Sequence, residues 1–254
     1  MSKGLVFKEF NELKWKLGLG FVALLLLTVL VVVLYEQLLT LIPEAQSEIP
    51  PFFGEALFEG FSDYTNAMFS NLNDRNMPQI GSVLAIFIGI GLLGPEIESG
   101  SITLLLTNGL SRRRIFWTKA LIAVIAIWLM FMLVGLAVLP VSSLFGYTLR
   151  HSRIIGATAV TALGLGFVLA VSLLVSTIIK EKLWGVITSS AVFAVWSVAG
   201  FFKSIRMLSP FYHMRARDYY YGTSAFPWLT VAIFLFATLI VMWIAEQRFL
   251  REEL

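Results

Sequence analysis

The sequence predicts an all-α integral membrane protein that crosses the bilayer six times. Of its 254 residues 58% are hydrophobic and only 14% are charged, and the mean hydropathy is +0.83. Soluble domains carry about 25% charged residues, because a domain of this size needs a polar surface in water. The apolar surface of this chain must therefore face lipid. The absence of cysteine also excludes disulfides, thiolate metal sites and a cysteine nucleophile.

Six apolar runs are long enough to cross a hydrocarbon core of about 30 Å, which takes roughly 17–25 helical residues. They cover residues 17–34, 78–94, 115–141, 154–179, 183–202 and 227–245, and the second is the shortest. No fixed-period repeat divides the chain, so we treat 1–254 as a single transmembrane domain.

The loops between these runs predict the orientation, because Lys and Arg concentrate on the cytoplasmic side. Basic residues flank the runs on one side: Lys3, Lys8, Lys14, Lys16, Arg112, Arg113, Arg114, Lys119, Lys180, Lys182, Arg248 and Arg251. Both termini are therefore predicted to be cytoplasmic. The long loop 35–77 on the other side is acidic, which fits this orientation. Other segments of that side weaken the bias because they contain the basic residues Arg150, Arg153, Lys203, Arg206, Arg215 and Arg217.

Two segments outside the runs have amphipathic helical patterns. Residues 1–16 place Val6, Phe10 and Leu13 on one face, which predicts an elbow helix lying in the cytoplasmic interface, with a plain charged anchor as the alternative. The loop 35–77 contains a second such face after Pro50 and Pro51. It consists of Phe58, Phe61, Thr65, Met68 and Leu72.

The middle of every run is free of Asp, Glu, Lys, Arg and His. A charge at the centre of a span costs about 2.5–3.5 kcal/mol, so it persists mainly where function requires it. Ion-coupled transporters usually keep such a residue to couple the ion to the substrate. We therefore expect no ion-coupling site, no catalytic acid or base and no metal ligand; His151 and His213 stand alone. Hydroxyls do occur in the runs and either pack helices together or line a substrate path: Thr158, Thr161, Ser172, Ser176, Ser189, Ser190 and Ser197.

The sequence does not support nucleotide binding by either of two common motifs. Gly89, Gly91 and Gly94 match G-x-G-x-x-G, but they close a membrane run instead of joining a strand to a helix. No P-loop is present, so we expect this chain to bind no ATP and no other cofactor.

The most informative stretch is residues 95–120, PEIESGSITLLLTNGLSRRRIFWTKA. After Glu96 and Glu98 the chain turns at 99–101, where Ser99 or Ser101 can cap a short apolar helix, and Asn108 and Gly109 can end it. Ser111 can cap the third run. The pattern predicts a short helix between two spans at the cytoplasmic surface, which fits either a docking element or an ordinary interfacial loop.

This stretch resembles the signature of the ABC-2 type (type V exporter-like) permeases, the membrane subunits of many bacterial and archaeal ABC exporters. The matching positions are Glu96, Glu98, Gly100, Ser101, Ile102, Leu105, Leu106, Thr107, Leu110, Ser111, Arg112, Ile115 and Lys119. Gly109 stands where the family usually has proline, and Thr118 where it has glycine.

The resemblance implies a non-catalytic permease subunit in a prokaryotic plasma membrane. The segment around Gly100–Leu110 would be a coupling helix seated in a separate nucleotide-binding ATPase subunit, present in two copies, which holds ATP and Mg. A second permease subunit, identical or related, would complete the exporter. Glu96 and Glu98 would pair with basic residues of the elbow helix or of the ATPase. The alternative is a membrane anchor that transmits force and passes no substrate.

Overall fold

The computed structural model describes residues 3–45, 63–100, 102–107 and 109–251, and this part of the chain is helical with connecting turns. Six of its helices or helical runs are long and apolar enough to cross a membrane: Gly4–Thr40, Tyr64–Glu98, Arg112–Leu144, His151–Ser176, Lys182–Ala199 and Trp228–Leu250. Each contains or overlaps one of the six predicted runs. The prediction of an all-α protein with six membrane-length helices is therefore confirmed.

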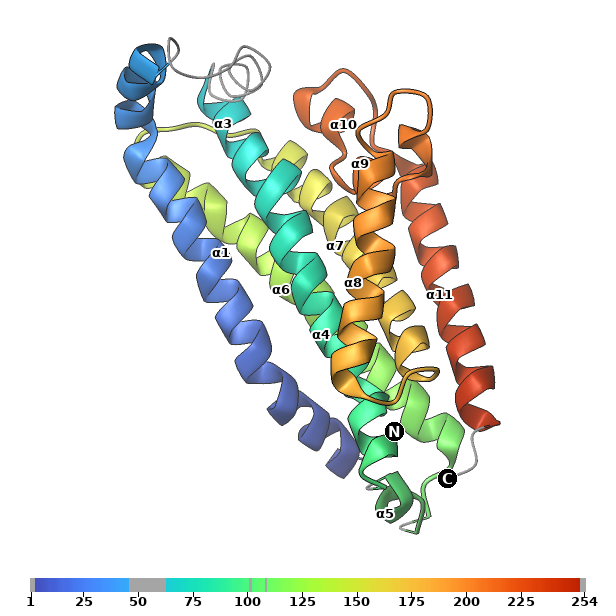
Figure 1. Cartoon of the computed structure of the whole chain (residues 1–254). Helices are drawn as coiled ribbons and strands as arrows, with labels where there is room; N and C mark the ends of the chain where they lie inside the picture. Colours follow the sequence, from blue (N-terminus) through green and yellow to red (C-terminus); the bar gives the residue numbers. More distant parts are fainter. Residues whose placement is uncertain (1–2, 46–62, 101, 108, 252–254) are drawn as a thin grey trace.

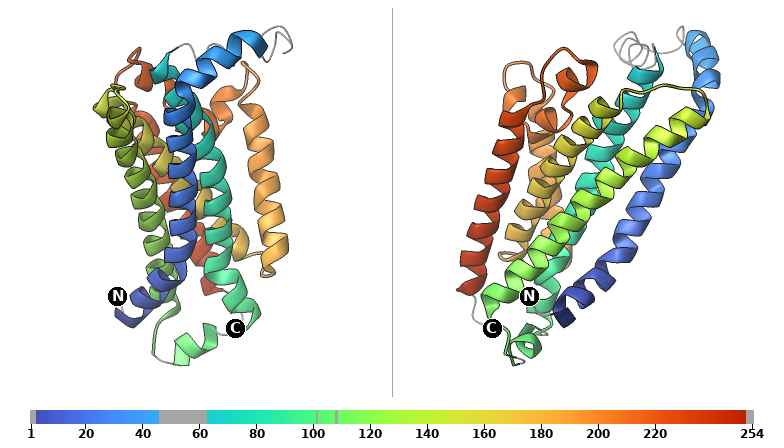
Figure 2. Two further views of the ribbon diagram at one scale, coloured as in Figure 1. Left: turned by 90° about the vertical axis from the view of Figure 1, so that its left-hand side faces the viewer. Right: turned by 180° about the vertical axis from the view of Figure 1, so that it is seen from behind.

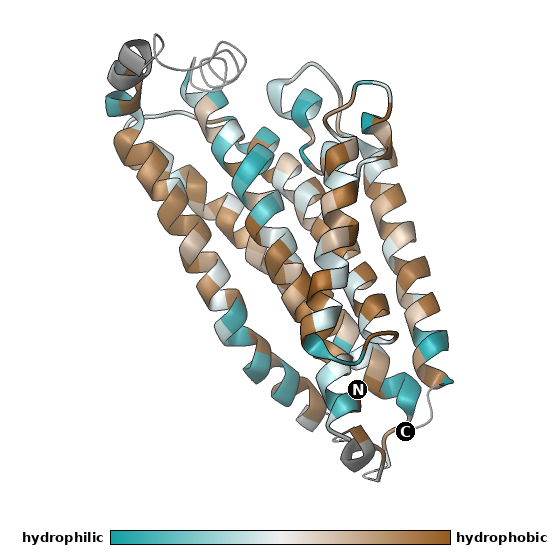
Figure 3. Ribbon diagram, viewed as in Figure 1, coloured by the Kyte–Doolittle hydropathy of each residue, from teal (hydrophilic) through white to brown (hydrophobic). Residues whose placement is uncertain are grey.

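The helices form an elongated bundle with two distinct ends (Figure 1). One end carries both chain termini and the short helix α5 (Ile102–Thr107), and we call it the base. The opposite end, the rim, carries α3 (Tyr64–Asn71), α9 (Pro210–Met214) and α10 (Arg217–Tyr221). Hydrophilic residues gather at the base and the rim, and hydrophobic residues dominate between them (Figure 3).

The first span is longer than the sequence predicted. Helix α1 (Lys3–Ala45) has 43 residues, which corresponds to about 65 Å at 1.5 Å per residue, twice the hydrocarbon thickness. The predicted elbow segment and the first run are thus parts of one helix, because neither Pro nor a capping residue separates them. Both ends of α1 bend away from its middle part (Figure 2, left).

The side of α1 that packs inside the bundle differs from the apolar face expected for residues 1–16. Leu5, Glu9 and Leu13 are buried at four-residue spacing, whereas Phe10 is exposed and Val6 is half-buried. Residues four apart lie on one helical face. Only Leu13 of the three predicted residues is therefore buried, and a carboxylate takes a place on the inner face.

The second span also begins earlier than its apolar run. Helix α3, the π-helical turn η1 (Leu72–Asn76) and α4 (Met77–Glu98) follow one another without a break. Met68 and Leu72, predicted to lie on an external amphipathic face, are buried in the bundle. The amphipathic pattern therefore marks an extension of the span; Phe58 and Phe61 fall outside the described residues.

Helix α7 (His151–Ser176) lies at the centre of the bundle and packs against α4, α6 (Arg112–Leu144), α8 (Lys182–Ala199) and α11 (Trp228–Leu250). Glycine permits a close approach of α4 to α7 and to the turn after it: a Cβ on Gly89 would lie 2.7 Å from the backbone oxygen of Leu169, and one on Gly94 would lie 3.0 Å from that of Lys180. Two glycines of the rejected nucleotide motif therefore serve helix packing.

The outer helices α1, α8 and α11 carry large exposed hydrophobic side chains, such as Leu26, Val195 and Phe236. Side chains of this kind suit contact with lipid tails, since water would not favour so many on one surface. Aromatic side chains pack together at the rim, where the rings of Tyr64 and Tyr147 are stacked with their centres 3.9 Å apart. Burial raises the pKa of Tyr220, whose phenol donates to the backbone oxygen of Thr65 at 3.2 Å.

Candidate coupling site at the base of the bundle

Helix α5 is the short helix predicted between the second and third spans. It covers Ile102–Thr107 and is bounded by two glycines with left-handed backbone, Gly100 (φ 69°) and Gly109 (φ 77°). Glycine adopts this conformation without the steric cost that a Cβ brings, so each glycine allows a sharp reversal of the chain. The prediction that Gly109 ends the helix is confirmed. Ser101 and Asn108 lie outside the described residues.

The two serines of this segment have different roles. Ser99 is the C-terminal cap residue of α4, so it does not begin α5 as the sequence allowed. Ser111 is the N-cap of α6, and its hydroxyl accepts a hydrogen bond from the backbone N–H of Arg114 at 3.3 Å. The predicted cap of the third span is therefore confirmed.

Among the described side chains of α5, Ile102 packs into the bundle. Ile102 is fully buried and belongs to the hydrophobic core. Leu106, Leu110 and Arg112 are half-buried, while Thr107 is exposed. The side chain of Leu105 is outside the described part of the structure. α5 thus has one end tied to the core and the other at the surface of the base (Figure 1).

Next to α5, four charged side chains from three helices form an ionic cluster, which we define as Lys8, Glu9, Glu96 and Lys119. The ammonium of Lys119, two turns into α6, lies 2.6 Å from Glu9 Oε1 on α1 and 2.9 Å from Glu96 Oε1 on α4. Lys8 donates to the same oxygen of Glu96 at 2.8 Å. The cluster therefore joins α1, α4 and α6 at the point where α4 ends and α5 begins.

The members of the cluster differ in burial. The side chains of Lys119 and Glu9 are each 2% exposed, that of Glu96 is 14% exposed and that of Lys8 is 43% exposed. A buried charge is tolerated only when a partner and hydrogen bonds replace its water. Lys119 and Glu9 therefore depend on each other, whereas Lys8 retains solvent.

Carboxylate oxygens of Glu9, Glu12 and Glu96 come within 4.8 Å of one another, a spacing that could hold a cation. Two lysine ammonium groups contact these oxygens and supply the compensating charge. Ion pairing accounts for the arrangement without a metal.

A second buried carboxylate joins the last helix to the base. Glu246 of α11 is fully buried, and its Oε1 lies 2.8 Å from Nε of Arg113 on α6. The two atoms are close enough for an ion pair, but their geometry is not that of a hydrogen bond. Phe249 packs against Phe116 beside it, with ring centres 6.1 Å apart. Four of the six spans are therefore tied together by charge at the base.

The expected pairing of Glu96 with a basic residue of the N-terminal segment is present, with Lys8 as its partner. Glu98 is exposed at the end of α4. The sequence interpretation missed Glu9 and Glu246, and it assigned Lys119 to the solvated cytoplasmic flank. Lys119 lies four residues inside the third apolar run, and that position was the available signal of a buried charge.

Most of the predicted hydroxyl side chains of the spans lie in the interior of the bundle. Thr161 donates to the backbone oxygen of Met214 at 2.8 Å, and Ser172 and Ser176 donate to carbonyls of their own helix. Thr158 and Ser189 are fully buried, Ser197 is half-buried, and Ser190 is exposed. For the buried members these are the environments of packing residues.

Six membrane-length helices, lipid-type outer faces and a charged base with a short connecting helix define a polytopic α-helical membrane protein. Residues 5–254 match the model of the ABC-2 family of transporter proteins, so the chain belongs to this family of transporter membrane components. No curated protein matches the chain.

Proposed function

We propose that this chain is the permease subunit of an ATP-driven exporter, and that a separate nucleotide-binding subunit drives it through α5. The observation that carries the proposal is the position of α5: it links α4 to α6 at the base, beside the ionic cluster, in a chain of the ABC-2 family. Two ATPase copies and a second permease subunit, identical or related, complete the assembly.

The base is assigned to the cytoplasm of a prokaryotic cell, with the chain in the plasma membrane. Both termini lie at the base, as does the start of α6 with its three consecutive arginines (Figure 1). Dense basic charge near the ends of spans favours the cytoplasmic side. An ATPase in the cytoplasm would then face α5 directly.

The ionic cluster links α1 to α4 and α6, the two spans that α5 connects. A displacement of α5 would pull directly on α4 and α6, which it joins, and on α1 through two short ion pairs, Lys119–Glu9 and Lys8–Glu96. Buried charges resist separation, since each would lose its partner in a medium of low dielectric constant. The base of α1, α4 and α6 would therefore move as one unit during the ATPase cycle.

A second function, a membrane anchor that transmits force and passes no substrate, uses the same coupling. The long α1 and the α3 extension favour it, because they carry the bundle beyond the hydrocarbon core toward the rim. The two functions differ in whether ATP hydrolysis moves a solute.

The test is co-purification of the tagged chain with candidate ATPases encoded beside it, followed by an ATPase assay in lipid. Leu105→Asp places a charge in α5, and Leu144→Asp, at an 82% exposed leucine in the last turn of α6, is the matched control. We expect Leu105→Asp to abolish the complex or its stimulated hydrolysis, and the control to leave both intact.

Failure of every ATPase to co-purify, together with a silent Leu105→Asp, would refute the coupling role of α5. A stable, hydrolysing complex that moves no lipid, peptide or drug probe across a vesicle membrane would instead favour the anchor function.

A further inference from the structure

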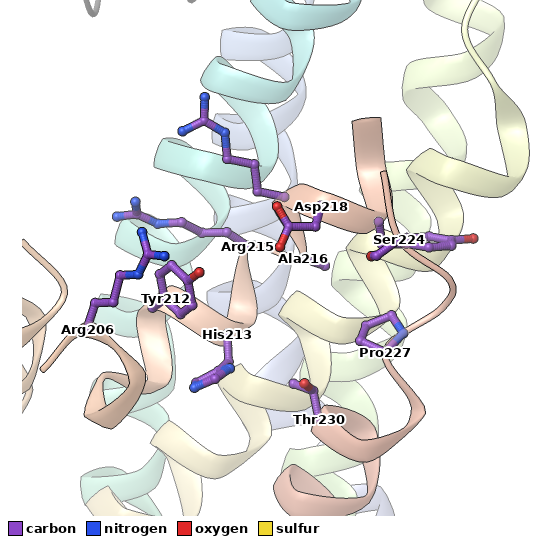
Figure 4. Close-up of a pocket in the computed structure, with 11 residues that line it drawn as sticks. Arg206, Tyr212, His213, Arg215, Ala216, Asp218, Ser224, Pro227 and Thr230 are labelled. Atoms are coloured by element: carbon purple, nitrogen blue, oxygen red, sulfur yellow. The ribbon is translucent and has the colours of Figure 1, made fainter. Parts of the chain in front are cut away.

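Two cavities lie side by side at the rim, and they differ in chemistry. The first, which we call the basic cavity, has a volume of about 380 Å³ and includes Arg206, Arg215, Arg217 and Asp218 in its lining. Figure 4 shows Arg206, Arg215 and Asp218 at this cavity, with His213 and Thr230 on its lower side in that view. Three arginines against one aspartate among the described lining residues make the cavity attractive to anions.

Two of the three guanidinium groups of the basic cavity stack on tyrosine rings. Arg206 lies over the ring of Tyr212 at 4.9 Å, and Arg217 lies over that of Tyr221 at 5.7 Å. A guanidinium that stacks by its face keeps its N–H groups available at the edge for phosphate or carboxylate oxygens.

Arg215 has incomplete hydrogen bonding at this cavity. Its Nε is buried and lies 3.2 Å from Asp74 Oδ1, but the angle is not that of a hydrogen bond, and no described acceptor takes its proton. A buried donor without an acceptor is costly, so such groups commonly mark a site for a ligand, ion or water.

The second cavity, which we call the apolar cavity, has a volume of about 320 Å³ and lies between α7, α8, α9 and α11. Its lining is largely hydrophobic and includes Phe167, Trp196, Ile233 and Phe234. His213 and Thr230 line both cavities, so the two are adjacent. The Nε2 of His213 donates to the backbone oxygen of Met207 at 2.9 Å, which joins α9 to the turn before it.

The backbone is strained at the basic cavity. Ala216, between two of the arginines, has φ 47° and ψ 38°, a left-handed conformation that costs a residue with a Cβ about 1–2 kcal/mol. Strained residues cluster at ligand sites, because the surrounding structure holds them there for a purpose other than stability. The strain thus coincides with the arginines that line the cavity.

The charge pattern of the whole chain points the same way. Basic residues at the rim oppose the orientation signal of the base, since Lys and Arg are normally sparse on the side away from the cytoplasm. On that side of the membrane, arginines that bind no ligand should be rare, yet three of them line one cavity.

From these observations we propose that the rim binds an anionic amphiphile, a phospholipid whose acidic headgroup lies in the basic cavity and whose acyl chain lies in the apolar cavity. Phosphate oxygens would accept from the arginine edges and from Nε of Arg215, which has an ion-pair contact with Asp74 but no hydrogen bond. In the proposed orientation the site faces the outer leaflet; that placement and the charge-pattern argument rest on the proposed orientation, whereas binding itself is independent of any ATPase.

The test is native mass spectrometry of the full chain, delipidated in a non-ionic detergent and titrated with phosphatidylglycerol or with phosphatidylcholine of the same acyl chains. Inorganic phosphate serves as a competitor without a chain. The headgroup variant is Arg206→Gln with Arg217→Gln, and the chain variant is Ala237→Phe, which fills the apolar cavity. Arg75→Gln with Lys203→Gln removes the same charge from two exposed residues outside both cavities and is the control.

We expect phosphatidylglycerol to bind more tightly than phosphatidylcholine, and the headgroup variant to weaken its binding by about tenfold or more, as loss of charged hydrogen bonds implies. Ala237→Phe should weaken the binding of both lipids, and the control should leave the binding of both unchanged. Equal binding of the two lipids, or equal losses in the headgroup variant and the control, would overturn the site. If inorganic phosphate displaces phosphatidylglycerol and Ala237→Phe does not change lipid binding, the site binds a simple anion, and the proposal of an amphiphilic ligand is wrong.

Discussion

Replacement of Lys119 by methionine tests the ionic cluster most directly. Methionine keeps the length of the side chain and removes the charge, which leaves the buried carboxylate of Glu9 without its 2.6 Å partner. Breaking a buried pair from one side costs about 3–5 kcal/mol, whereas an exposed pair contributes about 0–1 kcal/mol. Lys8→Met is the matched control, since the side chain of Lys8 is 43% exposed and that of Lys119 is 2% exposed.

Thermal unfolding of the purified chain in detergent provides the measurement. At about 2–4 °C per kcal/mol, Lys119→Met should lower the unfolding temperature by roughly 6–20 °C, and Lys8→Met by no more than about 4 °C. Adding Glu9→Gln to Lys119→Met removes the stranded charge, so the double variant should be more stable than Lys119→Met alone. Equal stability of the two lysine variants, or further loss in the double variant, would show that the cluster does not hold α1 to α6.

Two further predictions concern backbone positions. Gly89→Ala should destabilise the bundle by about 1–3 kcal/mol, because the new Cβ would lie 2.7 Å from the backbone oxygen of Leu169, whereas Gly18→Ala, with nothing within 4 Å, should stabilise α1 by about 0.5–1 kcal/mol. Equal effects of the two in thermal unfolding would argue against close α4–α7 packing. Ala216→Gly should raise the unfolding temperature by relieving about 0.5–1 kcal/mol of net strain, and Ala232→Gly within α11 should lower it; a fall in both would refute the left-handed conformation.

The sequence by itself determined the parts of this protein that depend on local chemistry. Six apolar runs predicted six membrane-length helices, because the hydrophobic length needed to cross a bilayer is a property of each segment alone. Ser111 and Gly109 marked the start of α6 and the end of α5, since capping and left-handed backbone depend on a few neighbouring residues. The short helix at the base could be placed for the same reason.

Only the tertiary structure decided where the helices continue past the lipid and which charges meet. Hydropathy reports the part of a helix that lipid surrounds, so it did not reveal that α1 includes the elbow segment or that α3 extends α4. Glu9 and Lys119 are 110 residues apart in the chain, and their pairing depends on how α1 packs against α6. The two cavities at the rim combine side chains of five α-helices, α7 to α11. Periodicity and hydropathy act along the chain, whereas an ion pair or a cavity exists only between elements that packing has brought together.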